Sequence, residues 1–354
     1  MNILFIGPYR GPNSDGWSIA SRRYLEALFL TGHNIACRPI YMAGSGGDVS
    51  NKIKTAEGVV FDKIDVVIQN ALPDFFETHD AYNIGIFFTE TRHIDKTGWV
   101  EKINLLDEVW TNSAAEAQSL IESGVKCKIS EVPIPYKPAN TEPNIIPLPE
   151  IDNKFVFYFI GENTDRKNIM ALVKAFHREF LPNEDVSLFI KNNSNDLKDQ
   201  INKWHNYSRL RKEYIPEVII SNTIPEEQIL SMHKASSCFV CTSRGESFCL
   251  PMIDALYYNN HVICTDKIFP VSLFPDDIIA VKSHETPVDT QSPPIPNIYT
   301  SHETWQEVDI LDLQKKMRAV YNNGKSSADT RKTVLEKLSC ESIAKRMKES
   351  LACL

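Results

Sequence analysis

The chain has 354 residues, with 46 Asp and Glu against 38 Lys and Arg, which gives a formal net charge of −8 and a pI near 5.7. This balance excludes a generally basic nucleic-acid binder. Hydrophobic residues make up 42% of the chain and charged residues 24%, a composition that excludes the disordered and fibrous classes. The length allows two domains of ordinary size.

Segments that direct a chain to a membrane or to export are not evident. No apolar run approaches the roughly 18 residues that span a bilayer, and the first residues, 1–6, lack the pattern of a signal peptide. Eight cysteines without paired spacing favour free thiols in a reducing compartment, so we expect a cytoplasmic protein. The one CxxC, Cys238 to Cys241, lies in an apolar strand pattern and is interpreted as two core cysteines.

Apolar, β-rich runs alternate with amphipathic stretches, which is typical of parallel sheets covered by helices. In the first half, a strand is predicted at 3–6, then a loop over 7–16 and a helix over 17–31. A second helix is predicted over 114–123, with Ser113 as its N-cap. The other strands predicted in this half are 35–40, 66–69, 84–88, 108–110 and 130–132.

The stretch 133–149 holds six prolines and no regular period, which predicts a linker with a domain boundary near residue 150. A second alternating series follows the linker. Its predicted strands are 155–160, 186–190, 218–221, 238–241 and 261–265, and its predicted helices are 169–180, 225–235 and 251–258.

The last part of the chain is predicted to be mainly helical, over 309–323 and 328–351. Before it, the proline-rich stretch 286–296 is predicted as a surface excursion. The predicted domains are therefore 1–150 and 151–325, followed by a helical segment, 326–354.

Ligands of such sheets bind at the carboxyl ends of the strands, so a cleft between the two domains is the expected site. Gly7, Gly11 and Gly16 frame the first strand-to-helix turn, whose N–H groups suit a phosphate. The glycine spacing is neither that of the dinucleotide fingerprint nor that of the P-loop, so an NAD-dependent dehydrogenase fits poorly. An ordinary turn is the alternative to a ligand contact here.

Two adjacent cations, Arg166 and Lys167, stand between the strand 155–160 and the next helix. They suit a diphosphate, because Arg chelates oxygens in a fork and Lys supplies a point charge. Cations at a helix amino terminus oppose the macrodipole, so we expect an anion between them rather than a solvated pair.

Two carboxylates follow the strand 238–241. Glu246 lies in the loop and suits sugar hydroxyls, and Asp254 lies on the helix and suits the two hydroxyls of a ribose. As a bare pattern, two acids separated by seven residues are also common on exposed surfaces.

Together, Arg166-Lys167 and Glu246-x7-Asp254 resemble motifs of the retaining GT-B glycosyltransferases of the GT4-like group, the glycosyl transferases group 1 family. The family signature usually reads Glu-Gly-Phe-Gly-Leu-Pro, followed by a second Glu. This chain has Ser247 and Cys249 in place of the two glycines and Asp254 in the second acidic place. In the first half, the segments 85–91 and 106–113 are similar to family members.

The resemblance implies an α/β protein with two Rossmann-like parallel-sheet domains facing a cleft (GT-B). The domain 1–150 would lie on the acceptor side and 151–325 would bind the nucleotide sugar. The implied reaction is retaining transfer by front-face displacement, without a metal or cofactor and with a UDP- or GDP-linked donor. The implied catalytic residues are Glu246, Arg166 and Lys167. The implied donor-binding residues are Gly16, Glu90, Ser247, Phe248, Cys249, Leu250 and Asp254.

Two positions stay open within the resemblance. Family members often place a histidine of the first domain against the donor sugar, and here either Glu90 or His93 would take that place. Many members carry an Arg after the glycine that ends the second domain's first strand, where this chain has Glu162. No Asp-x-Asp pair stands at a strand end and no His/Cys cluster has ligand spacing, so no metal site is predicted.

The acceptor is open: a glycan, a lipid-linked sugar or another hydroxyl compound. A membrane-bound acceptor favours a basic and aromatic patch, for which Arg22, Arg23 and Tyr24 are the candidates; a solvated helix face is the alternative. Competing functions are a nucleotide-sugar-binding protein with impaired catalysis, a phage-type glycosyltransferase of DNA bases, and a GT-B-like epimerase or phosphorylase. No general nucleic-acid binding is expected.

Overall fold

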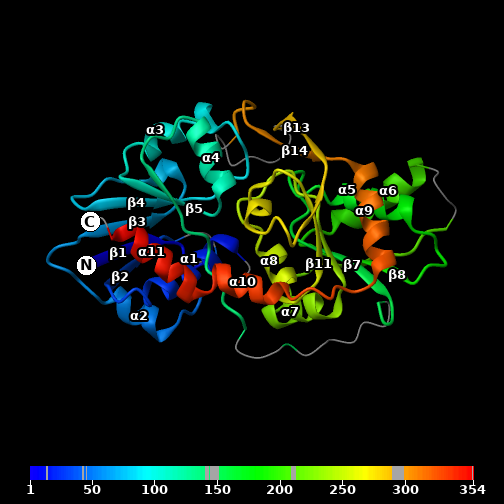
Figure 1. Ribbon diagram of the computed structural model, residues 1–354, viewed down its shortest axis with the longest axis horizontal. Helices are drawn as coiled ribbons and strands as arrows, with labels where there is room; N and C mark the ends of the chain where they lie inside the picture. The colour runs from blue at the N-terminus through cyan, green and yellow to red at the C-terminus, as the bar shows by residue number, and fades with distance from the viewer. Residues whose placement is uncertain are drawn as a thin grey trace. The chain divides into compact units, whose positions relative to one another are not determined.

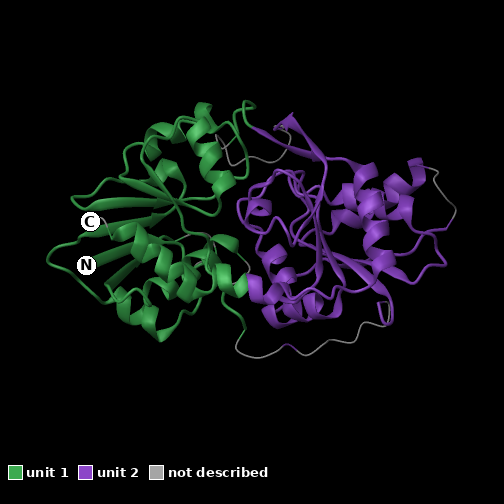
Figure 2. Ribbon diagram, in the orientation of Figure 1, with its two compact units in different colours: residues 1–139, 294–303, 334–354 green, residues 140–293, 304–333 purple. Residues whose placement is uncertain are grey.

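The computed structural model describes residues 1–12, 15–41, 44, 46–139, 143, 151–208, 213–288, 299–352 and 354. The chain forms two compact units (Figure 2). Unit 1 comprises residues 1–139, 294–303 and 334–354, and unit 2 comprises 140–293 and 304–333. The boundary predicted near residue 150 and most of the predicted linker lie outside the described residues.

Unit 1 is built on six parallel strands in the order β2-β1-β3-β4-β5-β6. Their bounds are β1 Asn2–Gly7, β2 Asn34–Pro39, β3 Val66–Asn70, β4 Tyr82–Ile86, β5 Glu108–Thr111 and β6 Lys128–Glu131. The predicted strands of this half are all present, with ends shifted by one or two residues. The strand order reverses between β1 and β3, and the carboxyl edge at such a reversal is the position at which doubly wound sheets bind ligands.

Most helices of unit 1 begin at a residue whose side chain caps them; α3 begins after Gly98, without such a cap. The Asp15 carboxylate accepts from Ser18 N–H at the start of α1, and the Ser113 hydroxyl accepts from Glu116 N–H at the start of α4. The helices are α1 Gly16–Leu28, α2 Asn51–Glu57, α3 Trp99–Ile103, α4 Ala114–Glu122 and α11 Cys340–Leu351, with short 3₁₀ turns η1 Pro73–Phe75 and η2 Ile94–Lys96.

The single helix predicted over 328–351 is two helices, α10 Thr330–Leu338 and α11 (Figure 1). The break falls at Ser339, whose hydroxyl accepts from Ser342 N–H and caps α11. Helix α11 packs on α1. Its Ser350 hydroxyl accepts from Trp110 Nε1 at 3.0 Å and donates to Glu108 Oε1 at 2.6 Å, so the end of the chain is fixed to unit 1.

Unit 2 repeats the plan with six parallel strands in the order β12-β11-β10-β7-β8-β9. Their bounds are β7 Phe155–Ile160, β8 Val186–Lys191, β9 Val218–Ile220, β10 Cys238–Cys241, β11 His261–Thr265 and β12 Ile279–Val281. Strands β7 and β10 are neighbours, and the chain winds outward from them in both directions. This reversal is the position at which doubly wound sheets bind ligands.

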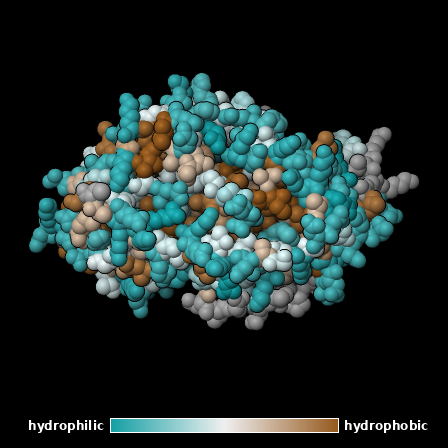
Figure 3. All heavy atoms as spheres, viewed as in Figure 1, coloured by the Kyte–Doolittle hydropathy of each residue, from teal (hydrophilic) through white to brown (hydrophobic). Residues whose placement is uncertain are grey.

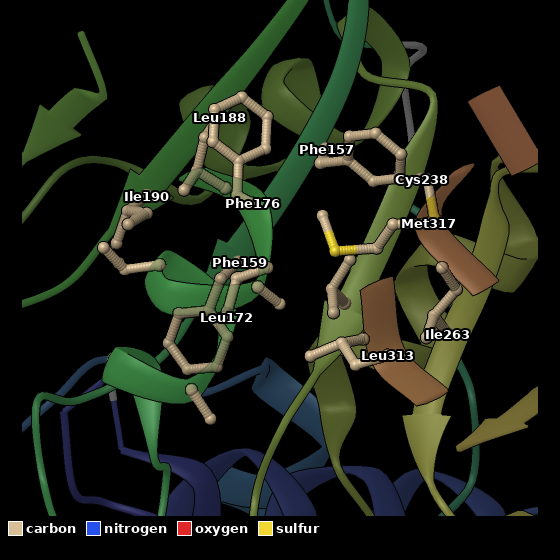
Figure 4. Packing of buried hydrophobic residues seen from close by; sticks show 14 of the residues in the cluster. Phe157, Phe159, Leu172, Phe176, Leu188, Ile190, Cys238, Ile263, Leu313 and Met317 are labelled. Atoms are coloured by element: carbon tan, nitrogen blue, oxygen red, sulfur yellow. The ribbon is translucent and has the colours of Figure 1, made fainter. Parts of the chain in front are cut away.

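The helices of unit 2 are α5 Ile169–Glu179, α6 Asp196–Ser208, α7 Glu226–Ala235, α8 Leu250–Tyr257 and α9 Ile310–Asn323. Helices α5, α6 and α9 cover one face of the sheet. Figure 4 shows the core of that face, where Phe157 and Phe159 of β7 lie against Phe176 of α5 and Met317 of α9. Continuous aromatic and β-branched runs in β7 and β8 fit strands that are buried on both faces.

Differences from the predicted elements in unit 2 are local. Helix α6 was not predicted, because its sequence is polar on most of its surface and buries only Leu197 and Ile201. The first two residues of the predicted excursion, 286 and 287, belong to a strand, β13 Ser283–Pro287, which pairs antiparallel with β14, Thr304–Val308. The rest of the excursion, from residue 289, lies outside the described residues.

The surface and the thiols are ordinary for such a fold. None of the described helices is long and apolar enough to cross a bilayer. The face in Figure 3 is covered mainly by hydrophilic residues, with smaller hydrophobic areas between them. The seven cysteines within the described ranges are free, and Cys238 and Cys241 are buried in β10 as predicted.

Candidate functional site

The two predicted cations and the predicted loop carboxylate form one cluster in unit 2. Lys167 Nζ lies 2.6 Å from Glu246 Oε1, and Arg166 NH1 lies 3.3 Å from Glu246 Oε2. Arg166 NH1 also donates to the Gly245 carbonyl at 2.7 Å. The anion expected between the cations is therefore present as Glu246 itself. We call Arg166, Lys167 and Glu246 the cation–carboxylate cluster.

The cluster lies at the strand-order reversal, because its residues come from the loops that follow β7 and β10. A second layer of contacts holds these loops together. Arg244 N–H donates to the Arg166 carbonyl at 2.7 Å, and the Thr242 hydroxyl donates to the Asn168 carbonyl at 2.9 Å. Arg244 also pairs with Glu307 of β14 at 2.5 Å. Sequence patterns did not single out Arg244 or Glu307, because their contacts join segments 63 and 78 residues apart.

The electrostatics of the cluster follow from its burial and its charges. Burial by itself raises the pKa of the Glu246 carboxyl, but Lys167 and Arg166 outweigh it and lower that pKa from 4.5 to about 2. Burial lowers the pKa of the Lys167 ammonium, and the Glu246 charge outweighs it, so the net shift is upward. All three groups are therefore charged at neutral pH, with a net charge of +1.

The remaining residues of the acidic segment lie around the start of α8. Ser247, Phe248 and Cys249 are buried, and Leu250, the first residue of α8, is half-buried. Asp254 is half-buried on α8, and its carbonyl accepts from Tyr258 N–H.

Cys249 stands where the signature that this chain resembles has a glycine, and the backbone conformation at this position accounts for a glycine there. Its backbone is left-handed, with φ of 60° and ψ of 72°, directly before α8. Glycine adopts this conformation without a steric penalty, whereas a residue with a Cβ is strained in it. The Cys249 sulfur lies 4.0 Å from the Cys241 sulfur, so the replacement fills space at the end of β10.

We predict that Cys249→Gly is more stable than Cys249→Ala. Both variants remove the sulfur, so the comparison isolates the backbone. Left-handed strain of about 1–2 kcal/mol in Ala, less the about 0.5–1 kcal/mol of extra chain entropy that Gly loses on folding, leaves Gly ahead by about 0.5–1 kcal/mol. Urea unfolding of the two variants measures the difference.

The matched control for this prediction is Cys264 in β11, a buried cysteine without a positive φ. There, Cys264→Gly should be less stable than Cys264→Ala, because a strand position gives glycine no steric advantage. If Ala is the more stable replacement at both positions, the left-handed backbone at Cys249 carries no measurable strain.

The predicted phosphate turn of unit 1 lies at its own strand-order reversal, after β1. Gly11 approaches Ser18 so closely that a Cβ on Gly11 would lie 2.0 Å from the Ser18 hydroxyl oxygen. Arg22 NH1 donates to the Tyr9 and Gly11 carbonyls at 3.0 Å each and fixes the turn. Gly16 is the first residue of α1, next to the capping Asp15.

The structure shows the surroundings of the three positions whose roles the resemblance left undecided. Glu90 lies beyond the end of β4, is half-buried, and accepts a 3.5 Å hydrogen bond from the Tyr299 hydroxyl. His93 is exposed and has a left-handed backbone before η2. In unit 2, Glu162 is exposed and accepts from Asn193 Nδ2 at 3.3 Å.

The candidate membrane patch on α1 is corrected by the structure. Tyr24 is fully buried and donates to the Val132 carbonyl at 2.9 Å. Arg22 holds the phosphate turn, and the Arg23 guanidinium lies over the Tyr136 ring, 5.4 Å from its centroid. These side chains stabilise unit 1 and do not form an exposed basic and aromatic surface.

Comparison with known proteins gives a family match over the part of the chain that holds the cluster. Residues 141–284 match the model described as glycosyl transferases group 1. The chain is a glycosyltransferase. The match includes Arg166, Lys167 and Glu246 and ends within β13. No curated protein sequence matches the chain significantly.

Solved structures share the fold over the whole chain. Sucrose-phosphate synthase from Thermosynechococcus elongatus has a TM-score of 0.64 at 14% identity, covering 100% of this chain and 98% of its own. A glycosyltransferase from Rickettsia africae has 0.64 at 14%, covering 99% and 97%. Anabaena HepE, solved with UDP-glucose, has 0.62 at 13%, covering 100% of both chains. The predicted fold class, two Rossmann-like parallel-sheet domains of the GT-B type, is confirmed.

Proposed function

We propose that this glycosyltransferase moves a sugar from a nucleotide-sugar donor to an acceptor hydroxyl with retention of anomeric configuration. The cation–carboxylate cluster carries the proposal, because it sets two cations at the ligand-binding edge of unit 2. The matched family and the UDP-glucose complex of Anabaena HepE support a nucleotide-sugar donor. In a front-face displacement the acceptor attacks from the side on which the diphosphate leaves, and a diphosphate oxygen takes the acceptor proton.

The exposure of the cluster matches an anionic leaving group. The Glu246 side chain is 6% exposed, whereas Lys167 and Arg166 are 15% and 19% exposed. A ligand arriving from solvent therefore meets the cations, with the carboxylate behind them. With a net charge of +1, the cluster attracts an anion and stabilises the charge that develops on the departing diphosphate.

Each residue of the site has a distinct role in this proposal. Arg166 and Lys167 bind the diphosphate, and Glu246 holds both cations in place. A carboxylate has about four lone-pair sites, so Glu246 can also accept from a hydroxyl of the donor sugar. Asp254 would take the ribose hydroxyls, and Gly16 and Glu90 of unit 1 would contact the donor.

Arg166 and Lys167 supply the positive charge that stabilises the leaving diphosphate, so we propose a reaction without a cofactor. The proposed donor is a UDP- or GDP-linked sugar. The acceptor is a glycan, a lipid-linked sugar or another hydroxyl compound. The reaction would take place in the cytoplasm.

Binding of UDP-, GDP-, ADP- and CMP-sugars, measured by calorimetry with EDTA present, tests the proposal. One nucleotide should bind, and Arg166→Ala should weaken its binding about 10- to 100-fold, because a charge-assisted hydrogen bond is worth about 1.5–3 kcal/mol. Lys198→Ala, an exposed lysine of α6, is the control and should change nothing.

Transfer itself needs a second readout. With the donor identified, the anomeric configuration of the product by NMR distinguishes retention from inversion. Binding without transfer to any hydroxyl acceptor, and without donor hydrolysis, would favour a binding protein with impaired catalysis. No binding of any of the four nucleotides would contradict the proposed donor class.

A further inference from the structure

A second cluster of chemically active side chains lies in unit 2, and the proposed transfer does not use it. His177 in the last turn of α5, His205 in the last turn of α6 and Glu217 directly before β9 each bring one donor atom within 4.8 Å of the other two. His177 Nε2 is hydrogen-bonded to Glu217 Oε1. We call these three residues the histidine cluster.

The histidine cluster is shielded and its rings are held in place. The side chains of His177 and Glu217 are 2% and 10% exposed. The His205 ring stacks on Tyr214, with centroids 3.8 Å apart and planes at 4°, and it meets the His177 ring edge-on at 4.7 Å. His205 Nε2 is buried and has no hydrogen-bond partner among the described residues. A buried nitrogen without a partner is costly unless something binds it.

The donor set suits a transition-metal ion. Two imidazoles and one carboxylate are ligands of zinc sites that keep a fourth position for water. The carboxylate of Glu217 supplies a negative charge to the ligand set, which favours a divalent cation.

The topology separates this cluster from the cation–carboxylate cluster. In a parallel sheet each helix starts at the carboxyl edge of one strand and returns to the amino edge of the next. The ends of α5 and α6 and the residue before β9 therefore lie at the amino edge, opposite the loops that hold Lys167 and Glu246. A metal there would not reach the transferred sugar.

We propose that His177, His205 and Glu217 bind one divalent ion of the zinc type, which joins α5, α6 and the edge strand β9. This site is structural and independent of the proposed transfer reaction. Strand β9 has three residues and, among the described strands, only β8 as its neighbour, so a metal ligand directly before it would fix the edge of the sheet.

The test uses the whole 354-residue chain after EDTA has been removed by dialysis, with Zn²⁺ in calorimetry and Co²⁺ in absorption spectroscopy, and without nucleotide. We expect one equivalent to bind, visible Co²⁺ d–d bands of a four- or five-coordinate site, and a melting temperature raised by several degrees. His205→Ala and Glu217→Gln should each weaken binding at least about 100-fold, since even supporting residues of metal sites contribute 10- to 100-fold.

Two controls locate the ion. His284→Ala removes an exposed histidine of β13 and should leave binding unchanged. Cys249→Ala should also leave it unchanged, although Cys241, Glu246 and Cys249 likewise bring donor atoms within 4.8 Å of one another. No saturable binding, or binding that survives both His205→Ala and Glu217→Gln, overturns the proposal; loss of binding in Cys249→Ala would assign the ion to the cysteines instead.

Discussion

Replacing Glu246 with Ala is expected to lower the free energy of unfolding by about 3–5 kcal/mol, the usual cost of breaking a buried ion pair. The variant leaves Lys167 and Arg166 side by side, 15% and 19% exposed, without their counter-ion. Transfer activity should fall at least about 100-fold, because the cations that meet the diphosphate lose their fixed positions. Urea unfolding and steady-state kinetics measure the two effects.

The pH dependence of the same contact has a definite sign. The pKa of Glu246 is lowered from 4.5 to about 2 in the folded protein, so its contribution is fully present above pH 4.5 and is lost as the pH falls toward 2. The difference corresponds to about 3 kcal/mol. The stability gap between the wild type and Glu246→Gln should therefore narrow over this range.

Two comparisons separate the role of Glu246 in stability from its role in transfer. Glu162→Ala removes an exposed carboxylate shortly after β7 and should change neither the free energy of unfolding nor the transfer activity. Adding Lys167→Met to Glu246→Ala removes one unpaired cation and should recover stability but not activity. If activity survives in Glu246→Ala while stability falls, the cluster supports the fold alone and the proposed diphosphate site is wrong.

The sequence was sufficient to predict elements with a strong local period. Continuous apolar runs such as 155–160 became central strands, and Ser113 capped α4 as predicted. The elements that were missed have weak local signals: α2 and α3 are five to seven residues long, and α6 is polar. The break at Ser339 was missed because the stretches on both sides of it are helical and no Gly or Pro separates them.

The candidate site shows where local patterns stop being informative. Arg166, Lys167 and Glu246 were each singled out, but the sequence assigned them to different parts of a donor. Their mutual contact spans 79 residues and depends on β7 and β10 being neighbours, which local patterns do not specify. The histidine cluster was missed for the same reason, because its three residues belong to separate elements without a ligand spacing.

Acid is expected to destabilise unit 2 through His233, a buried residue of α7. The Tyr158 hydroxyl bonds to His233 Nδ1 at 2.7 Å, and Asn260 Nδ2 donates to that hydroxyl at 2.9 Å. A neutral His233 ring can accept from the Tyr158 hydroxyl at Nδ1, whereas a protonated ring cannot. Burial lowers the pKa of His233 from 6.5 to about 3.

The sign follows from proton binding in the two states. Between pH 6.5 and 3 the unfolded chain binds a proton at His233 that the folded chain does not, so stability falls as the pH falls. The loss should reach about 2.5–3 kcal/mol at pH 4.5 and about 5 kcal/mol near pH 3. Glu246 does not contribute in the interval from pH 6.5 to 4.5, because its shift acts only below it.

Chemical unfolding of the wild type and His233→Phe at several pH values measures this effect. His233→Phe should be less stable at pH 7, because the Tyr158 hydroxyl loses its acceptor, yet its stability should fall less steeply below pH 6.5. His205 and His33 also have lowered pKa values and contribute to the wild-type slope, so the difference between the two proteins is the relevant quantity.

His284→Ala, which removes an exposed ring, should keep the wild-type slope. Equal slopes in wild type and His233→Phe would mean that His233 is already protonated in the fold. A steeper wild-type slope would mean that the neutral ring joins α7 to β7, on the face of the sheet that α8 also covers.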